Sequence, residues 1–173
     1  MRFPLDVFNA VKQEISKCGS NAPIGVRLSA TDWLESHDEM TNSWTIEQST
    51  EFCRQLEQHG CDFIDVSSGG ISPHQQIKLK PGYQVEFAAT IKQAVGLPVT
   101  AVGLITEPEQ AEQIVADQLA DAVMLGRGFL NDPRWPWRAA SALGETLDAP
   151  APYWRCIPAN QANPFNETTY GTR

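Results

Sequence analysis

The sequence lacks the features of a membrane, secreted or nucleic-acid-binding protein. Its 173 residues contain no apolar run that approaches the roughly 20 residues needed to span a membrane. The first residues do not have the basic, apolar and small-residue order of a signal peptide. Lys and Arg number 13 against 21 Asp and Glu, and the formal net charge of −8 argues against a nucleic acid or an anionic membrane as partner.

The cysteines are scattered along the chain, and their spacing excludes two further kinds of site. The four cysteines, Cys18, Cys53, Cys61 and Cys156, form no CxxC pair, so neither a zinc site nor a redox motif is indicated. We therefore predict no metal site. Reduced thiols and a cytoplasmic location are the simplest expectation for such a chain.

What the sequence does contain is an alternation of short apolar runs and amphipathic segments. A hydrophobic content of 42% and five Trp suffice for one packed domain. We expect strands at 24–30, 61–67, 98–102 and 122–125, and helices at 3–18, 45–60, 83–95, 107–118 and 133–143. Residues 1–150 would form the domain, and the Pro- and Asn-rich residues 151–173 an arm or a disordered tail.

Strands that alternate with helices at this spacing are parallel strands joined by helical crossovers. Four such units are half of an eight-stranded TIM barrel, which needs about 250 residues. A doubly wound open sheet is the alternative, but its Gly-rich turn follows the first strand. Here the Gly-rich turn follows the last strand, which favours the barrel.

Residues 121–133 predict an anion site. The apolar run 122–125 breaks at Gly126-Arg127-Gly128 and then becomes helical, so that free N–H groups and a helix dipole would face one point. Arg127 adds a charge whose geometry suits phosphate. Gly103 ends the preceding strand and would let a ligand approach the backbone. An ordinary left-handed turn is the alternative for either glycine, but two glycines with Arg127 favour phosphate.

Seven segments, in this order and at this spacing, resemble the Old Yellow Enzyme family of flavin oxidoreductases, most closely its xenobiotic-reductase or thermophilic-like branch. Each segment alone is weak evidence for the family, but the ordered set is specific to it, and the resemblance extends from Met1 to about Arg155. The family fold is a (β/α)8 TIM barrel that holds FMN at the carboxyl ends of its strands. The resemblance implies that this chain is the C-terminal half, strands five to eight. The segments are RFPLDV (2–7), VRLSATD (26–32), FIDVSSG (63–69), PGYQ (81–84), AVGLIT (101–106), DAVMLGR (121–127) and NDP (131–133).

The resemblance also implies roles for individual residues. Arg27 would lie beside the flavin pyrimidine edge and stabilise the reduced flavin; a structural ion pair to an interior carboxylate is the alternative. Gly103, Gly126 and Arg127 would bind the FMN phosphate. Ser67 would border the substrate cavity, with capping of its own loop as the alternative.

The segment 151–155 (APYWR) resembles the arm with which this branch reaches into a partner subunit's active site. Tyr153 and Arg155 would then be substrate or interface residues in a homo-oligomeric parent. An arm that packs on its own barrel, or is disordered, is equally compatible with the residues.

The activity implied is FMN-dependent, NAD(P)H-driven reduction of activated alkenes, such as α,β-unsaturated carbonyls, or of nitro compounds. The family's substrate-anchoring His pair and proton-donating Tyr precede strand five, so we assign no catalytic residue here and expect a truncated, inactive fragment. Another FMN-binding TIM-barrel dehydrogenase is one alternative. The other is a non-catalytic half-barrel that assembles with a partner half or with itself.

Overall fold

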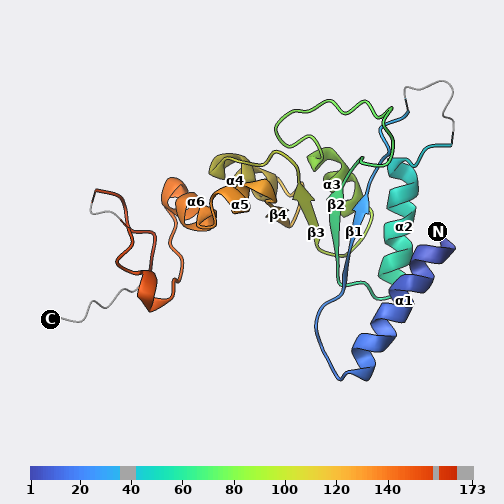
Figure 1. Cartoon of the computed structure of the whole chain (residues 1–173), viewed down its shortest axis with the longest axis horizontal. Helices are drawn as coiled ribbons and strands as arrows, with labels where there is room; N and C mark the ends of the chain where they lie inside the picture. Colours follow the sequence, from blue (N-terminus) through green and yellow to red (C-terminus); the bar gives the residue numbers. More distant parts are fainter. Residues whose placement is uncertain (36–41, 158–159, 167–173) are drawn as a thin grey trace.

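The computed structural model describes residues 1–35, 42–157 and 160–166. Helices and strands alternate along the chain, as the sequence predicts (Figure 1). The elements are α1 (Arg2–Lys17), β1 (Gly25–Ser29), α2 (Ile46–Gln58), β2 (Phe63–Ser67), α3 (Val85–Lys92), β3 (Val99–Val102), α4 (Pro108–Ala116), β4 (Ala122–Met124), α5 (Arg127–Asn131), α6 (Trp135–Leu143) and the 3-10 turn η1 (Ala151–Tyr153).

Within the described residues, the strands form one sheet of four in the order β1-β2-β3-β4, and every pairing is parallel. The predicted parallel α/β fold is therefore confirmed. The register places Arg27 opposite Asp65, Asp65 opposite Thr100, and Thr100 opposite Ala122. Because side chains in a row across a sheet point to the same face, these positions line one side of it.

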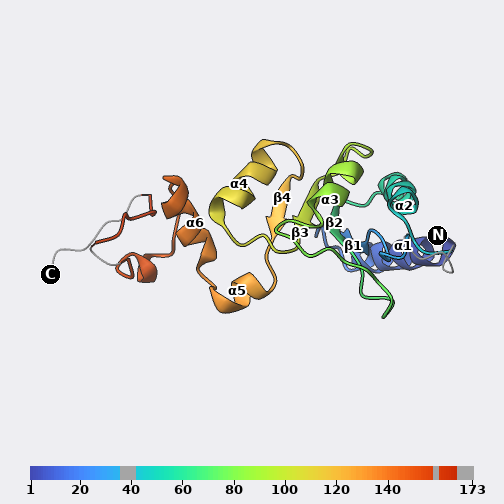
Figure 2. The ribbon, with the colours of Figure 1, turned by 90° about the horizontal axis from the view of Figure 1, so that it is seen from above.

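The two faces of the sheet differ in composition. Figure 2 shows α2, α3 and α4 along one face, α5 toward the other side, and α1 at the β1 end of the sheet, where it bonds to the end of α2. The face under α2–α4 carries the hydrophobic core, and its strand residues Ile64, Val66, Val99 and Ala101 are fully buried. The opposite face is the polar one, which carries the row that begins at Arg27. Burial of apolar side chains thus fixes which face of the sheet is left for polar chemistry.

Local sequence signals explain the helix boundaries. The side-chain oxygen of Gln48 accepts the N–H of Thr45 at 3.0 Å, which is the capping box predicted for the start of α2. At the other end of the chain, α6 stops at Gly144, whose φ of 72° lies in the left-handed region.

The segment after β4 differs from its prediction. We expected one helix at 133–143, and the structure contains the five-residue α5 followed by the separate helix α6. Pro133 has no N–H to continue the hydrogen-bond ladder of α5. Asp132 adds a turn, because its side chain accepts the N–H of Arg134 at 3.1 Å and pairs with Arg138 at 3.1 Å.

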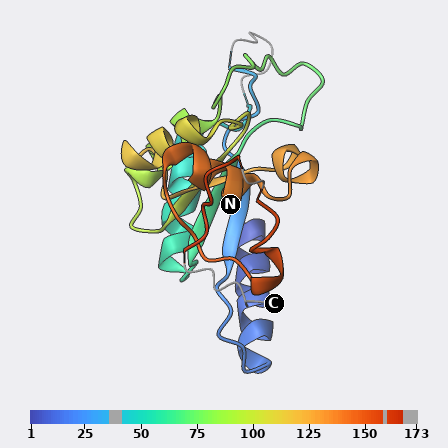
Figure 3. The ribbon, with the colours of Figure 1, turned by 90° about the vertical axis from the view of Figure 1, so that its left-hand side faces the viewer.

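The described part of the arm packs on α6 of its own chain. Trp137 of α6 has its ring centroid 5.3 Å from that of Tyr153 and 5.1 Å from that of Phe165. Arg134 lies over both Trp137 and Tyr153. Figure 3, viewed from the arm's side, shows the arm and α6 in front of the sheet. Residues 158–159 and 167–173 of the predicted tail lie outside the described residues.

The sheet has two open edges within the described part of the chain, since β1 and β4 each pair with one neighbour. Beside β1 runs an apolar groove of about 670 Å³, whose other wall is α1. No described helix is both long enough and apolar enough to cross a membrane.

Candidate functional site

A second cavity, of about 550 Å³, opens where the strands end, and we call it the carboxyl-end cavity. It receives residues from the ends of all four strands and from the start of α3. All four predicted cofactor residues and the predicted Ser67 share this one cavity, although they lie up to 100 positions apart in the sequence. Its lining includes Arg27, Ser67, Gln84, Gly103, Gly126 and Arg127.

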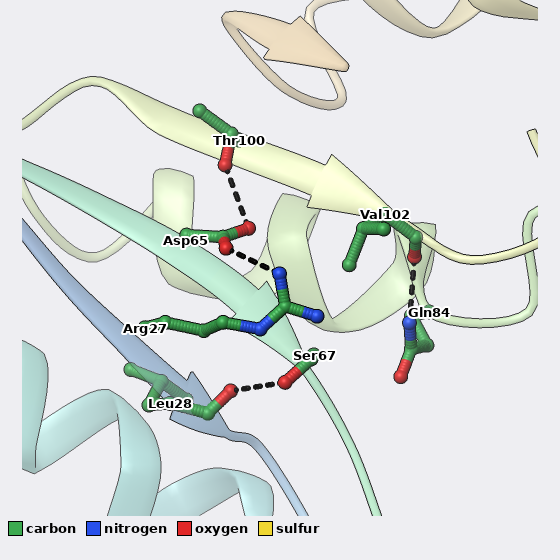
Figure 4. A network of polar contacts seen from close by, with 7 residues as sticks. All are labelled: Arg27, Leu28, Asp65, Ser67, Gln84, Thr100 and Val102. Atoms are coloured by element: carbon green, nitrogen blue, oxygen red, sulfur yellow. Dashed lines mark hydrogen bonds and ion pairs between the residues drawn. The ribbon is translucent and has the colours of Figure 1, made fainter. Parts of the chain in front are cut away.

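Arg27 enters the cavity from the polar face of β1. Its Nη1 donates to Oδ2 of Asp65 at 2.8 Å, and the other oxygen of Asp65 accepts the hydroxyl of Thr100 at 2.9 Å (Figure 4). The Arg27 side chain is 56% exposed, whereas that of Asp65 is 6% exposed. The two interpretations given for Arg27 therefore do not exclude each other: it forms an interior ion pair and also lines the cavity.

Gly103 ends β3 in a conformation that requires glycine. Its φ is 117°, and a Cβ added there would lie 2.5 Å from Nε2 of Gln84 and 2.9 Å from Cε1 of Tyr83. The next residue, Leu104, also has a positive φ, of 51°. Unfavourable backbone conformations persist only where the surrounding structure holds them in place, and they are found most often at functional sites.

Gly126 and Arg127 lie on the other side of the cavity. Gly126 has a φ of −81°, so the left-handed turn considered for it does not occur. A Cβ at Gly126 would meet nothing within 4 Å, which leaves its backbone open to a ligand. Arg127 is exposed and forms no ion pair with any described residue. Since α5 has only five residues, its dipole is small, and the positive charge here comes chiefly from the Arg127 guanidinium.

Sequence reasoning gave no role to a chain of hydrogen bonds that crosses the cavity wall. Nε1 of Trp33 donates to the Ser68 hydroxyl at 2.9 Å, and that hydroxyl donates to Oε1 of Gln84 at 2.6 Å. Nε2 of Gln84 then donates to the Val102 carbonyl at 2.7 Å (Figure 4). Gln84 is buried, which is unusual for glutamine. The only signal in the sequence was its place in the PGYQ segment, directly before α3.

The three residues predicted for substrate or interface have different surroundings. The Ser67 hydroxyl donates to the Leu28 carbonyl at 2.9 Å, so it ties β2 to β1 while it lines the cavity. Tyr153 and Arg155 lie on the arm and do not line the cavity of this chain. Tyr153 packs on Trp137, and Arg155 is exposed. Their role at a partner's site stays a prediction.

The residues of the cavity fit FMN. The cavity has the volume of an ordinary ligand site, and it carries a cation from each side, Arg27 from β1 and Arg127 after β4. Arg127, with the open backbone at Gly126, matches a phosphate in charge and geometry. Arg27 matches the ring system, which gains negative charge on reduction. The neutral polar side chains of Ser68 and Gln84 also line the cavity.

The fold and this site define a parallel β/α protein with a ligand cavity at the carboxyl ends of its strands, as in TIM-barrel enzymes. Parts of two solved TIM-barrel oxidoreductases have a similar fold. A 2-naphthoyl-CoA reductase superposes with a TM-score of 0.69 at 24% identity, over 82% of this chain and 21% of that protein. Histamine dehydrogenase from Rhizobium sp. 4-9 gives 0.61 at 22% identity, over 78% and 19%.

The chain belongs to the NADH:flavin oxidoreductase / NADH oxidase family, which it matches over residues 1–145. An NADPH dehydrogenase of Geobacillus thermodenitrificans is 40% identical over 135 residues, which are 78% of this chain and 38% of that protein. An NADH oxidase of Thermoanaerobacter brockii is 37% identical over 144 residues, 80% and 21% respectively. The resemblance to the Old Yellow Enzyme family is thereby confirmed. The chain spans about two fifths or less of the length of these relatives.

Proposed function

We propose that this chain is the FMN-phosphate half of an NAD(P)H-dependent flavin oxidoreductase. The observation that supports this most directly is that one cavity at the carboxyl ends of the strands is lined by all four residues predicted from the sequence to bind FMN: Arg27, Gly103, Gly126 and Arg127. Family membership supports FMN as the cofactor and NAD(P)H as the reductant. The four parallel strands would be strands five to eight of an eight-stranded barrel.

Each of these residues has a distinct task in this proposal. Arg127 and the backbone at Gly126 bind the phosphate, and Gly103 lets the ligand approach the end of β3. Arg27 places a positive charge beside the pyrimidine edge, where it favours the negatively charged reduced ring. The chemistry that FMN supplies is hydride transfer, from NAD(P)H to the β-carbon of an α,β-unsaturated carbonyl, or to a nitro compound.

By its resemblance to the family, the proton donor of that reaction would lie in the half of the barrel that precedes strand five. Among the described residues no histidine lines the carboxyl-end cavity, and Arg27 and Arg127 do not donate protons near neutral pH. We therefore propose that the 173 residues alone bind FMN weakly and do not turn over. In the whole enzyme, Tyr153 and Arg155 would contact substrate across a homo-oligomer interface.

The β1 edge supports assembly with a complementary half. The groove there is lined by α1 side chains that remain exposed, with Phe3 78% exposed, Val7 46% and Val11 45%. An open, apolar strand edge is a site for pairing with a further strand. Four preceding β/α units would cover this edge and the β4 edge, and would so close the eight-stranded barrel. Light scattering of the purified chain separates a monomer from a self-assembled form.

A titration with FMN and a turnover assay test the proposal. We expect weak, saturable quenching of FMN fluorescence by the purified chain. We expect no oxidation of NADPH when FMN and a cyclic enone are added. Absence of any FMN binding at millimolar chain would contradict the cofactor assignment. A yellow chain that reduces the enone would contradict the assignment of this chain as an inactive half.

A further inference from the structure

The polar face of the sheet carries a short hydrogen-bonded network of which the proposed function uses only Arg27. It consists of Arg27, Asp65 and Thr100, which lie side by side on three adjacent strands in direct register. Asp65 is the central member, and each of its two oxygens accepts one side-chain hydrogen bond. The network therefore joins β1, β2 and β3 below the carboxyl-end cavity.

Burial within this network is uneven. The Asp65 side chain is 6% exposed and Thr100 is 9% exposed, so neither can turn to solvent for another partner. The Arg27 side chain is 56% exposed, and its contact with Asp65 uses only Nη1. Figure 4 shows the guanidinium held on the side of Asp65, with its other terminal nitrogen directed away from that carboxylate.

The difference in exposure indicates that the buried Asp65 is the fixed member of the ion pair and that the exposed Arg27 is the residue it holds in place. A long, exposed arginine ordinarily samples many rotamers, and fixing it costs conformational entropy when a ligand binds. A buried carboxylate that is itself fixed by a hydroxyl restricts the arginine before the ligand arrives. The remaining donors of Arg27 are then presented to the cavity in a fixed direction.

We propose that Asp65, held in place by Thr100, is a positioning residue that orients the Arg27 guanidinium toward the flavin ring. Asp65 itself touches no ligand in this arrangement; it acts through Arg27. The inference rests on the proposed function for its ligand, FMN, but the anchoring of Arg27 is a property of the chain alone.

Two substitutions remove the anchor in different ways. Asp65→Asn removes the charge and keeps the shape, whereas Thr100→Val removes the hydroxyl and changes no charge. Asp117→Asn and Thr90→Val are matched controls, because both residues are exposed and do not line the cavity; Asp117 directly follows α4 and Thr90 lies on α3. Circular dichroism establishes that each variant is folded.

The sign of the change in affinity separates positioning from simple electrostatics. Loss of a negative charge alone would tighten the binding of both FMN and inorganic phosphate. Positioning predicts that D65N weakens FMN binding about tenfold and T100V about threefold, the size expected for a lost charge-assisted bond and for a loosened one. Inorganic phosphate, which would bind at Arg127, should keep its affinity within about twofold in both variants.

A measurement without ligand tests the anchoring of Arg27 independently of the proposed function. Nitrogen-15 NMR of the arginine side chains should show slow rotation of the Arg27 guanidinium in the wild type and fast averaging in D65N and T100V. If FMN does not bind the wild type, the proposed function fails, and the NMR result alone decides whether Arg27 is anchored. Identical Arg27 dynamics in all variants, or FMN affinity that is unchanged or higher in D65N and T100V, would overturn the inference.

Discussion

The two ends of the same sheet are built from different groups. At the amino end, carboxylates accept backbone N–H groups of the neighbouring unit: Asp62 from Ile24 at 2.7 Å, and Asp121 from Val99 at 2.8 Å. Glu57 accepts the N–H of Gly96 in the same way, at 2.8 Å. Each of these contacts joins one β/α unit to the next.

At the carboxyl end, the chain instead carries arginines and glycines around a cavity of about 550 Å³. Gly103 and Leu104 have positive φ there, and Arg127 has no ionic partner among the described residues. The comparison shows one sheet whose two ends serve different purposes. The amino end holds the β/α units together, and the carboxyl end keeps donors free for a ligand. The same kind of substitution should therefore have different effects on stability and on ligand affinity at the two ends.

The largest expected contrast comes from one substitution made at both ends, glycine to alanine. G103A forces a side chain into a φ of 117° and against Gln84 and Tyr83, so it should lower the free energy of unfolding by about 2–3 kcal/mol. At G96A the backbone φ is not positive, and the nearest atom is the flexible Glu57 carboxylate at 3.0 Å, so about 0.5–1 kcal/mol is expected. Urea denaturation measures both; equal losses would mean that Gly103 is not specially constrained.

The second contrast is in ligand affinity. R127A removes the cation that we assign to the FMN phosphate, and it should weaken FMN binding about 10- to 100-fold. Its effect on unfolding should stay within about 0.5 kcal/mol, since Arg127 is exposed and has no ionic partner among described residues. R54A on α2 is the control, because Arg54 only pairs with Glu51 at 3.5 Å on the surface. Calorimetric titration that finds equal losses for the two variants would refute the assignment of Arg127.

A smaller effect is expected at the amino end and depends on pH. The pKa of Asp121 lies below its ordinary value of 3.8, because the side chain of Lys92 and the backbone N–H of Val99 donate to its carboxylate. A pKa that is lower in the folded state stabilises the fold above the ordinary value, and this contribution is lost as the pH falls through the folded pKa.

D121N should therefore cost about 1 kcal/mol at neutral pH, a modest figure because the Asp121 side chain is 40% exposed. The cost should shrink below pH 3.8, where the wild type loses the same contribution. Urea titrations across this pH range measure it. The affinity of the folded protein for FMN should not change; a tenfold loss in D121N would show that the two ends are not independent.

The smallest effect concerns the thiols. Burial raises the pKa of Cys53 to about 12, and burial also raises the pKa of Cys61, whereas Cys18 and Cys156 are exposed. Iodoacetamide at pH 8 should modify the two exposed thiols quickly and the two buried ones only after unfolding. Because no thiol lines the carboxyl-end cavity, FMN should leave all four labelling rates unchanged, as mass spectrometry can establish. Protection of Cys18 or Cys156 by FMN would place the ligand elsewhere.

Part of the fold and of the site could be predicted from the sequence, because the signals for strands and for the glycines after them are local. The runs before Gly103 and Gly126 have the length and composition of buried parallel strands, and glycine after a strand marks a close backbone approach. The alternation of strand and helix then brings all the strand ends together. For this reason Arg127 could be assigned to a site at the strand ends, whereas Arg27, 100 positions earlier, was assigned from the family resemblance.

The rest depends on contacts that no local pattern records. The Trp33–Ser68–Gln84–Val102 hydrogen bonds join residues 16 to 35 positions apart, and each member alone is an ordinary loop or strand residue. The choice of Asp65 as the partner of Arg27 follows from strand register, which the sequence does not state. The arm's packing on Trp137 is also a tertiary contact, and it was one of several alternatives left open.

The central claim is that the carboxyl end of the sheet binds the FMN phosphate. Its most direct test is a titration of the nitrogen-15-labelled chain with FMN, followed by the backbone amide signals. We expect the largest shifts at Gly103, Gly126 and Arg127, with the amides of Ile24 and Val99 at the amino end unchanged. Shifts confined to the amino end or to the groove beside α1, or no shifts at millimolar FMN, would contradict the account.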